Sequence, residues 1–379
     1  VIIGAGSTNF GLGVVGDIFK SNFLEGSTII LHDINAKALD NTFKIASEYK
    51  EKIGKKSASL YHHTKGIREM SRETAIEYAE SGWVVRPHVD FWWSIKNHFG
   101  RTPNPDRVKF SKPGRDLYCD AQGNLKVVGD NVVNDDLANT LKRIAQNGAD
   151  IFYSGAIAHE IIEDMNSSGA LLTINDLKNY QTKRSSPLWG NYKGYDIATN
   201  NPPGGGVMLI QMLNILENFD LLDLGHNSSD YVRIVCEAMK RATIDKDLFV
   251  GDPNFLTVPT EHLIDKKYAF EQSNDIRNGK IADVKRLSTK TESKDTTHLS
   301  VIDSNGNAVS MTHSLGMPSG VITSGLGFMY NGCMGVFDPR PGNADSIAPG
   351  KSRFSSMSPS IVFKLSLIHI SEPTRLLSI

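Results

Sequence analysis

The clearest hydrophobic pattern in the chain is a pair of short runs toward its C-terminal end. Residues 299–302 and 308–311 are short, β-branched or apolar, which favours strands. Between them lies Asp303-Ser304-Asn305-Gly306-Asn307, in which Asn-Gly supplies the positive φ angles that a tight turn needs. The pattern therefore predicts a β-hairpin, and its first strand begins close to Thr296.

The rest of the chain alternates between helix and strand patterns. Helical spacing of apolar residues predicts helices over residues 138–146, 157–165, 207–216 and 231–242. Thr173 caps a further short helix, and residues 195–199 form a strand that leads into a Pro-Pro-Gly-Gly-Gly loop. Residues 273–292 are polar and charged, which suits either a flexible approach to a processing site or a plain surface linker.

The N-terminal residues have a pattern of their own. An apolar strand runs into a turn containing Gly4 and Gly6, and a second strand within residues 27–35 carries Asp33 near its end. This is half of a dinucleotide-binding βαβ unit, with glycines for the pyrophosphate turn and an acid for ribose hydroxyls. Two strands cannot bury their faces alone, so residues 1–55 are interpreted as an isolated Rossmann-like fragment.

Composition narrows the function classes. The 379 residues carry a net charge of −1, which argues against a general surface for nucleic acid or other polyanions. No apolar run approaches the roughly 20 residues that span a bilayer, so no membrane partner is expected. The three cysteines show no disulfide or metal-ligand spacing, so no disulfide framework and no metal site are predicted. Without a signal peptide the chain as given is expected in the cytoplasm, and a longer parent in the periplasm or outside the cell.

Several motifs, in order, resemble the γ-glutamyltranspeptidase family. They are Asn147-Gly148-Ala149-Asp150, Asn200-Asn201-Pro202-Pro203-Gly204-Gly205-Gly206, residues 215–220, Gly251-Asp252-Pro253, Thr296-Thr297-His298 with Gly306-Asn307-Ala308-Val309, and Ser355-Ser356-Met357-Ser358-Pro359. The resemblance covers about residues 75–364. It implies an N-terminal-nucleophile hydrolase with an α+β, four-layer α-β-β-α sandwich that is truncated at the C-terminus here.

The resemblance also implies self-cleavage. The precursor is expected to cut itself between Asp295 and Thr296, which leaves Thr296 with a free α-amine beside its hydroxyl. Such a residue is both nucleophile and base, so no cofactor is needed. The expected partners are a small-molecule amide or γ-glutamyl-like substrate and the chain's own large and small subunits. Water or an amine would accept the acyl group.

Individual roles follow only where residues match the family motif. Thr296 matches the nucleophile, Thr297 follows it, and Ser314 stands where a second hydroxyl residue hydrogen-bonds the nucleophile. Ser355 and Ser356 match the pair that binds the α-carboxylate of a γ-glutamyl group. His298 is expected to be a packed structural histidine.

Other family positions do not match. Gly316, Cys333 and Val336 replace the asparagine, glutamine and aspartate that bind the donor's α-amine, so an acyl group without that amine, such as a dicarboxylic monoamide, fits better. The donor-binding arginine is not assigned, since neither Arg68-Glu69 nor Arg72-Glu73 has the family context. The Gly-Gly pair of the oxyanion hole is not found, because the resemblance stops at Lys364.

The two ends of the chain leave alternatives open. Residues 1–41 resemble the NAD- and metal-dependent family-4 glycosidases, with Gly4, Gly6 and Asp33 as the weak alternative cofactor site, and residues 367–379 resemble a translated sequencing adaptor. The predicted organisation is a fragment at 1–55, a large-subunit region at 56–295, the start of a catalytic subunit at 296–366 and an artefactual tail at 367–379. The competing hypotheses are therefore an autoprocessing acyltransferase, a glycosidase fragment and a catalytically dead chimeric chain.

Overall fold

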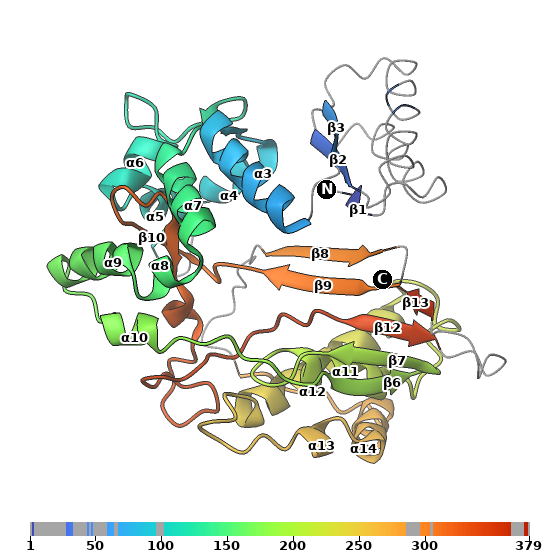
Figure 1. The fold of residues 1–379 in the computed structure, drawn as a ribbon. Coiled ribbons are helices and arrows are strands. Elements are labelled where there is room, and N and C mark those ends of the chain that lie inside the picture. Colours follow the sequence, from blue (N-terminus) through green and yellow to red (C-terminus); the bar gives the residue numbers. More distant parts are fainter. Residues whose placement is uncertain are drawn as a thin grey trace.

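A computed structural model describes the chain at residues 44, 47, 73–95, 102–285, 296–303 and 306–364, and its backbone alone at 2–3, 28–32, 59–63, 67–72 and 375–377. The N-terminal part contains a parallel sheet in the order β1 (Ile2–Ile3), β2 (Thr28–His32), β3 (Ser59–His63) (Figure 1). The third strand corrects the prediction of a two-stranded fragment. It gives a weak sequence signal because its Ser-Leu-Tyr-His-His run has only two central apolar positions.

A helical region follows along the chain. Its elements are α3 (Ile67–Ser81), β4 (Trp83–Val84), α4 (Pro87–Trp93), α5 (Asn104–Val108), α6 (Lys112–Tyr118), β5 (Asn131–Val132), α7 (Asp135–Asn147), α8 (Asp150–Tyr153), α9 (Ala156–Ser167) and α10 (Ile174–Lys178). One core cluster joins Val85, Trp93, Val108 and Val132. The burial of such apolar side chains is what holds short helices of this kind in place.

The helices begin where the sequence supplies caps. The Asn134 side chain accepts a hydrogen bond from the Leu137 N–H at 3.0 Å, and two aspartates occupy the first turn of α7. Gly148, with φ +77°, ends that helix. Thr173 forms a capping box with Asp176 at the start of α10, as the sequence predicts.

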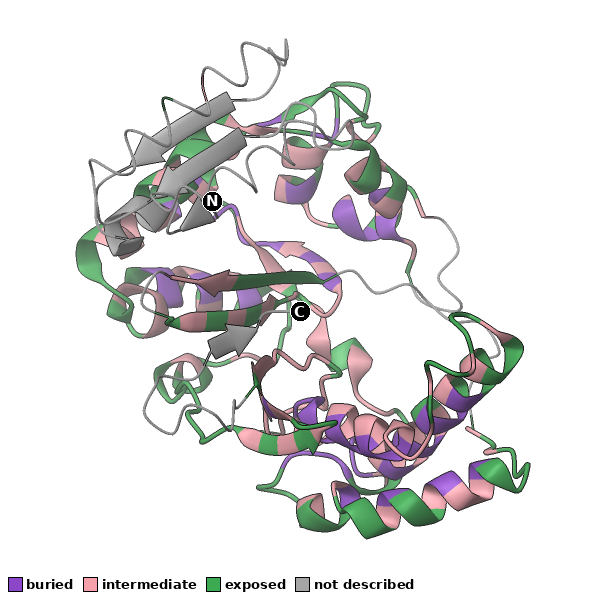
Figure 2. Ribbon diagram, turned by 90° about the vertical axis from the view of Figure 1, so that its right-hand side faces the viewer, coloured by how far each residue is buried: buried purple, intermediate pink, exposed green. Residues whose placement is uncertain are grey.

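The second half is built around an antiparallel sheet. Its strand order is β13 (Arg375–Leu377), β12 (Ile361–Lys364), β7 (Tyr195–Thr199), β6 (Leu188–Tyr192). Helices α11 (Gly206–Leu216), α12 (Ser229–Phe249), α13 (Thr260–Leu263) and α14 (Lys266–Arg277) lie beneath it in the view of Figure 1. Buried residues of α11, α12 and α14 share one core cluster, formed by Ile215, Ile234, Ala238, Ala269 and Ile276. Figure 2 shows buried and exposed positions alternating along the helices, as expected for helices that bury one face.

The predicted hairpin is present as β8 (Thr297–Ile302) and β9 (Ala308–His313). The two strands pair antiparallel, with Thr297 opposite His313. Gly306 has φ +82° in the turn, as the Asn-Gly signal predicts. In Figure 1 the hairpin lies above the β12-β7-β6 layer, and the Ser310 hydroxyl accepts a hydrogen bond from the Ser360 N–H just before β12. Helix layer, sheet and hairpin therefore stack in that order.

Among the remaining described elements, two strands form a separate sheet that packs against α5, α6 and α9. The strands are β10 (Pro318–Ile322) and β11 (Met329–Asn331), and the 3₁₀ helix η1 (Cys333–Val336) follows them. The predicted helices within residues 138–242 are all present. Residues 273–292 were predicted to be a flexible approach segment or a surface linker. The first five of them instead belong to α14, which ends at residue 277. Ser273 is fully buried there and donates to the Phe270 carbonyl at 2.7 Å.

Candidate active site

Thr296 and Ser314 lie at the open end of the hairpin. Because Thr297 pairs with His313, the residues just outside this pair, Thr296 and Ser314, face each other. The Thr296 hydroxyl donates to the Ser314 hydroxyl oxygen at 3.4 Å, a long contact. The Ser314 oxygen also accepts the Gly316 N–H at 2.9 Å, which fixes its position. The hairpin register thus brings the predicted nucleophile and its predicted hydroxyl partner together.

Ser355 and Ser356 are held in place by the glycine-rich loop before α11. The Ser355 N–H donates to the Pro203 carbonyl at 2.8 Å, and the Gly205 N–H donates to the Met357 carbonyl at 3.0 Å. A Cβ added to Gly205 would lie 2.5 Å from the Ser356 carbonyl oxygen. Only glycine allows this close approach of two backbones, so the Pro-Pro-Gly-Gly-Gly motif positions the serine pair.

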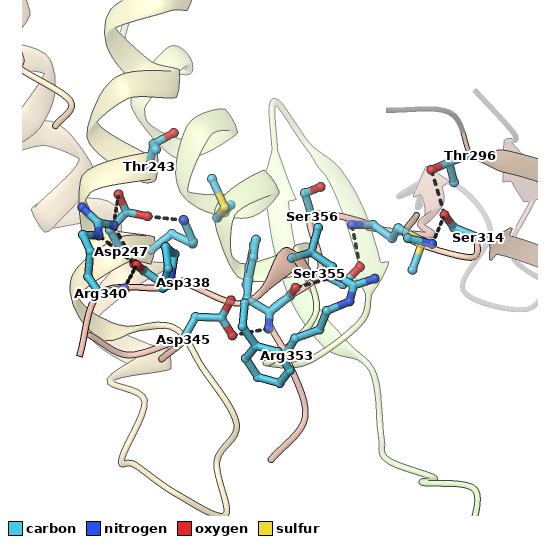
Figure 3. Close-up of a pocket in the computed structure, with 18 of the residues that line it drawn as sticks. Thr243, Asp247, Thr296, Ser314, Asp338, Arg340, Asp345, Arg353, Ser355 and Ser356 are labelled. Carbon is cyan, nitrogen blue, oxygen red and sulfur yellow. Dashed lines mark hydrogen bonds and ion pairs between the residues drawn. The ribbon is translucent and has the colours of Figure 1, made fainter. Parts of the chain in front are cut away.

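These residues share one pocket of about 510 Å³ (Figure 3). Its walls come from α12, the start of the hairpin, η1 and the segments at 336–345 and 353–357. The residues that line it include Lys246, Asp247, Lys285, Thr296, Ser314, Gly316, Val336, Asp338, Arg340, Asp345, Arg353, Ser355 and Ser356. The structure therefore places Thr296, Ser314 and both serines around a common cavity.

The other predicted residues have different positions. Thr297 opens β8 and is exposed, and it does not line the pocket. The prediction that His298 is a packed structural histidine is wrong, because its side chain is exposed. Its ring contacts the Thr312 hydroxyl at 2.8 Å, the Ser300 hydroxyl at 3.2 Å and the Ser310 hydroxyl at 3.4 Å, so it lies on the same face of the hairpin as Ser310. Asp295, Gly4, Gly6 and Asp33 lie outside the described residues.

The three substituted amine-binding positions do come together. A Cβ on Gly316 would lie 2.7 Å from the Cys333 sulfur and 3.7 Å from Val336 Cγ2. None of the three side chains offers an oxygen, so this corner of the pocket has no side-chain acceptor from them for an ammonium group. The three positions therefore adjoin one another at the pocket wall.

The far wall of the pocket carries charged residues that sequence reasoning did not single out. Arg340 makes a bidentate contact with Asp338, with a shortest distance of 2.6 Å, and lies 3.8 Å from Asp247. Hydrogen bonds from the Arg340 guanidinium lower the pKa of Asp338, even though burial opposes this. Lys246 is paired with Asp247. These charges are therefore mutually compensated.

The Asp345 and Asp252 carboxylates hold the segment at residues 350–356 in place through hydrogen bonds to its backbone. The Asp345 carboxylate accepts the Phe354 N–H, and burial raises the pKa of Asp345. Asp252, almost fully buried, accepts the Ser352 N–H at 2.8 Å and the Asn254 N–H at 3.1 Å. Burial alone would raise the pKa of Asp252, but these backbone donors lower it. The Gly-Asp-Pro motif thus anchors the segment that carries Ser355.

The described residues form neither a metal site nor a membrane-spanning helix. Within residues 73–95, 102–285, 296–303 and 306–364, His, Cys, Asp and Glu side chains form no group of three or more that could hold a metal. No helix among the described elements is long and apolar enough to cross a bilayer. The side chains of Arg68, Glu69 and Arg72 on α3 are not among those described.

Comparison with known families gives two matches. The family profile described as Gamma-glutamyltranspeptidase matches residues 69–370, and that described as Family 4 glycosyl hydrolase matches residues 1–75. Both resemblances inferred from the motifs are thereby confirmed, and the larger one covers most of the chain.

Curated relatives agree with the larger match. The Glutathione hydrolase proenzyme of Escherichia coli K12 is 38% identical over 260 residues, which is 62% of this chain and 44% of that protein. The Acylase ACY 1 proenzyme of Pseudomonas sp. SE83 is 37% identical over 296 residues, 77% of this chain and 51% of that protein. The chain spans about half the length of these relatives.

Solved structures show the same fold. Cephalosporin acylase from Bacillus halodurans superposes with a TM-score of 0.63 at 27% identity, covering 76% of this chain and 52% of that one. Helicobacter pylori gamma-glutamyltranspeptidase gives 0.51 at 29% identity, covering 66% and 69%. This likeness confirms the predicted α+β fold of the N-terminal-nucleophile hydrolase type. The chain belongs to the γ-glutamyltranspeptidase family.

Proposed function

We propose that the chain is an autoprocessing amidohydrolase or acyltransferase whose nucleophile is Thr296. The observation that carries the proposal is the Thr296 hydroxyl at 3.4 Å from Ser314, in the same pocket as Ser355 and Ser356. Family membership supports it, and so do relatives named as proenzymes. The division into a large region ending at Asp295 and a small one beginning at Thr296 is part of this proposal.

Processing is the first chemical step. The Thr296 hydroxyl attacks the Asp295 carbonyl carbon, and the peptide nitrogen of Thr296 leaves with a proton as the new α-amine. The resulting ester joins Asp295 to the Thr296 oxygen. Water then hydrolyses this ester, which frees the Asp295 carboxylate and restores the threonine hydroxyl. The Ser314 oxygen, held by the Gly316 N–H, orients the attacking hydroxyl through its hydrogen bond.

Amide cleavage repeats the same logic on a substrate. The free α-amine of Thr296 takes the hydroxyl proton as the oxygen attacks the amide carbonyl, and then gives a proton to the leaving amine. The acyl group stays on Thr296 as an ester until water or an acceptor amine takes it. Ser355 and Ser356 hydroxyls are proposed to hold a polar end of the acyl group across the pocket from Thr296.

The experiment is a mass measurement of the acyl-enzyme. The chain is mixed with an amide donor, quenched in acid and digested, and the peptide that begins at Thr296 is examined for the added acyl mass. Thr296→Ser, which keeps a hydroxyl, is expected to retain the label, and Thr296→Ala to lose it. Acyl mass on another residue, or amide turnover in Thr296→Ala, contradicts the assignment.

A further inference from the structure

Arg353 is a half-buried arginine in the wall of the pocket, two residues before Ser355. Its Nη1 donates to the Phe354 carbonyl at 2.8 Å. Its Nη2 lies 3.3 Å from the point that a Cβ on Gly316 would occupy, and Gly316 is the residue that fixes Ser314. In the view of Figure 3 the Arg353 side chain lies between Asp345 and Ser314. The guanidinium is therefore close to the Thr296–Ser314 pair.

The donors of Arg353 are mostly unused. A guanidinium has five N–H donors, and among the described residues the one acceptor in contact with this guanidinium is the Phe354 carbonyl. No carboxylate of the described chain forms an ion pair with it, whereas Arg340 is paired with Asp338 and Lys246 with Asp247. Arg353 thus has no carboxylate in direct contact, although its charge acts on the Asp345 carboxylate, and it brings unused N–H donors into the cavity.

The surroundings of Arg353 disfavour an ammonium group. Gly316, Cys333 and Val336 supply no side-chain oxygen beside it. The nearby Asp345 carboxylate already accepts the Phe354 N–H and is nearly fully buried. A substrate ammonium in this corner would face the guanidinium without a free carboxylate from these residues, and like charges at short range repel.

We infer that Arg353 sets acyl-donor specificity by binding a carboxylate on an acyl group that has no α-ammonium, together with the Ser355 hydroxyl. The substrate class is therefore the monoamides of short dicarboxylic acids. This inference rests on the proposed function, because it assigns the acyl group that Thr296 would receive. An arginine fork fits a carboxylate with two parallel hydrogen bonds, which a serine pair alone cannot provide.

The kinetic test compares p-nitroanilides of three acyl groups with equal chain length. Glutaryl carries a carboxylate, γ-glutamyl carries a carboxylate and an ammonium, and pentanoyl carries neither. The wild type is expected to prefer glutaryl over both others by about tenfold or more in kcat/KM. Arg353→Met is expected to reduce the ratio of glutaryl to pentanoyl about 10- to 100-fold, and Arg353→Lys less. Arg184→Met, at an exposed arginine, is the matched control. An unchanged ratio in Arg353→Met overturns the inference.

A binding measurement separates this inference from the proposed chemistry. Glutarate and pentanoate are titrated by calorimetry into the full chain carrying Thr296→Ala, with and without Arg353→Met. Glutarate is expected to bind about tenfold or more weakly when Arg353 is replaced. If neither the wild type nor any variant shows amidase activity but glutarate binding depends on Arg353, the proposed function fails, and only the carboxylate-binding role of Arg353 stands. If amidase activity depends on Thr296 but glutarate binds equally well without Arg353, the inference fails and the proposed function stands. The same conclusion follows if amidase activity depends on Thr296 and glutarate does not bind at all.

Discussion

The hydroxyl oxygens of Thr296 and Ser314 lie 3.4 Å apart, at the end of the hairpin where β8 begins and β9 ends. This distance follows from the strand register, since Thr296 and Ser314 are the neighbours of Thr297 and His313, the last pair of the ladder. A register shift of one residue would turn Thr296 to the other face of the hairpin. The candidate nucleophile is therefore positioned by the backbone ladder, and its hydroxyl is oriented by Ser314.

Replacing Ser314 with alanine tests this orientation. The variant removes the acceptor for both the Thr296 hydroxyl and the Gly316 N–H. Loss of one neutral hydrogen bond is worth about 0.5–1.5 kcal/mol, so self-cleavage is expected to slow by up to about tenfold. The half-time of cleavage is followed on denaturing gels. Ser314→Thr keeps the hydroxyl and is expected to cleave at nearly the normal rate, and equal rates in all three proteins would contradict the role.

Gly205→Ala tests the link between the glycine loop and the serine pair. Its Cβ would lie 2.5 Å from the Ser356 carbonyl oxygen and 2.7 Å from the carbonyl carbon, so the backbone at Ser356 must move. The expected result is a KM raised by about tenfold or more, because a shift of about 1 Å in a positioned group costs that much or more. Steady-state kinetics with glutaryl p-nitroanilide measure it.

The control for Gly205→Ala is Gly169→Ala. Gly169 has φ +69° and open space around its Cβ position, so the substitution strains only the local backbone after α9. It is expected to lower the melting temperature while leaving KM unchanged. A similar KM change in both variants would mean that general destabilisation, and not the contact with Ser356, is responsible.

Glu237 is expected to make stability depend on pH. It is almost fully buried and is bonded to Lys240, Arg241 and the Ala282 N–H. Burial alone would raise its pKa, but these donors outweigh burial and lower the pKa from 4.5 to about 2. Because the pKa is lower in the folded state, the stabilisation is complete above pH 4.5 and is lost as the pH falls toward 2.

Glu237→Gln measures that contribution. Breaking a buried ion pair costs up to about 3–5 kcal/mol, so the variant is expected to unfold at a lower urea concentration at pH 7. The difference from the wild type is expected to shrink between pH 4.5 and pH 2, as the wild-type carboxylate is protonated. A difference that stays constant over this window would rule out ionisation of Glu237 as its origin.

The sequence predicted the elements whose signals are local. The hairpin was predictable because β-branched runs and Asn-Gly lie side by side, and the cap of α10 because Thr173 and Asp176 are three residues apart. The serine pair could be predicted from its motif. Its fixation by Pro203 and Gly205 could not, since those residues are about 150 positions away in the chain.

Other features depended on tertiary context. Residues 273–277 look like a polar linker, yet they end α14, where packing buries Ser273 and the Phe270 carbonyl accepts its hydroxyl hydrogen. His298 is exposed, and its ring bonds to hydroxyl groups of the paired strand at Thr312 and Ser310, which single-strand patterning does not show. Arg353 was missed because a lone arginine has no periodic signal. Its position two residues before Ser355 was the one sequence clue to its place in the pocket.

The most direct test of the central claim is the intact mass of the purified chain after incubation at neutral pH. The account predicts two fragments whose masses correspond to cleavage between Asp295 and Thr296, with Thr296 as the first residue of the smaller one. Thr296→Ala is predicted to remain a single chain under the same conditions. A wild-type chain that stays uncut, or a cut at another bond, would contradict the assignment of Thr296 as the autoprocessing nucleophile.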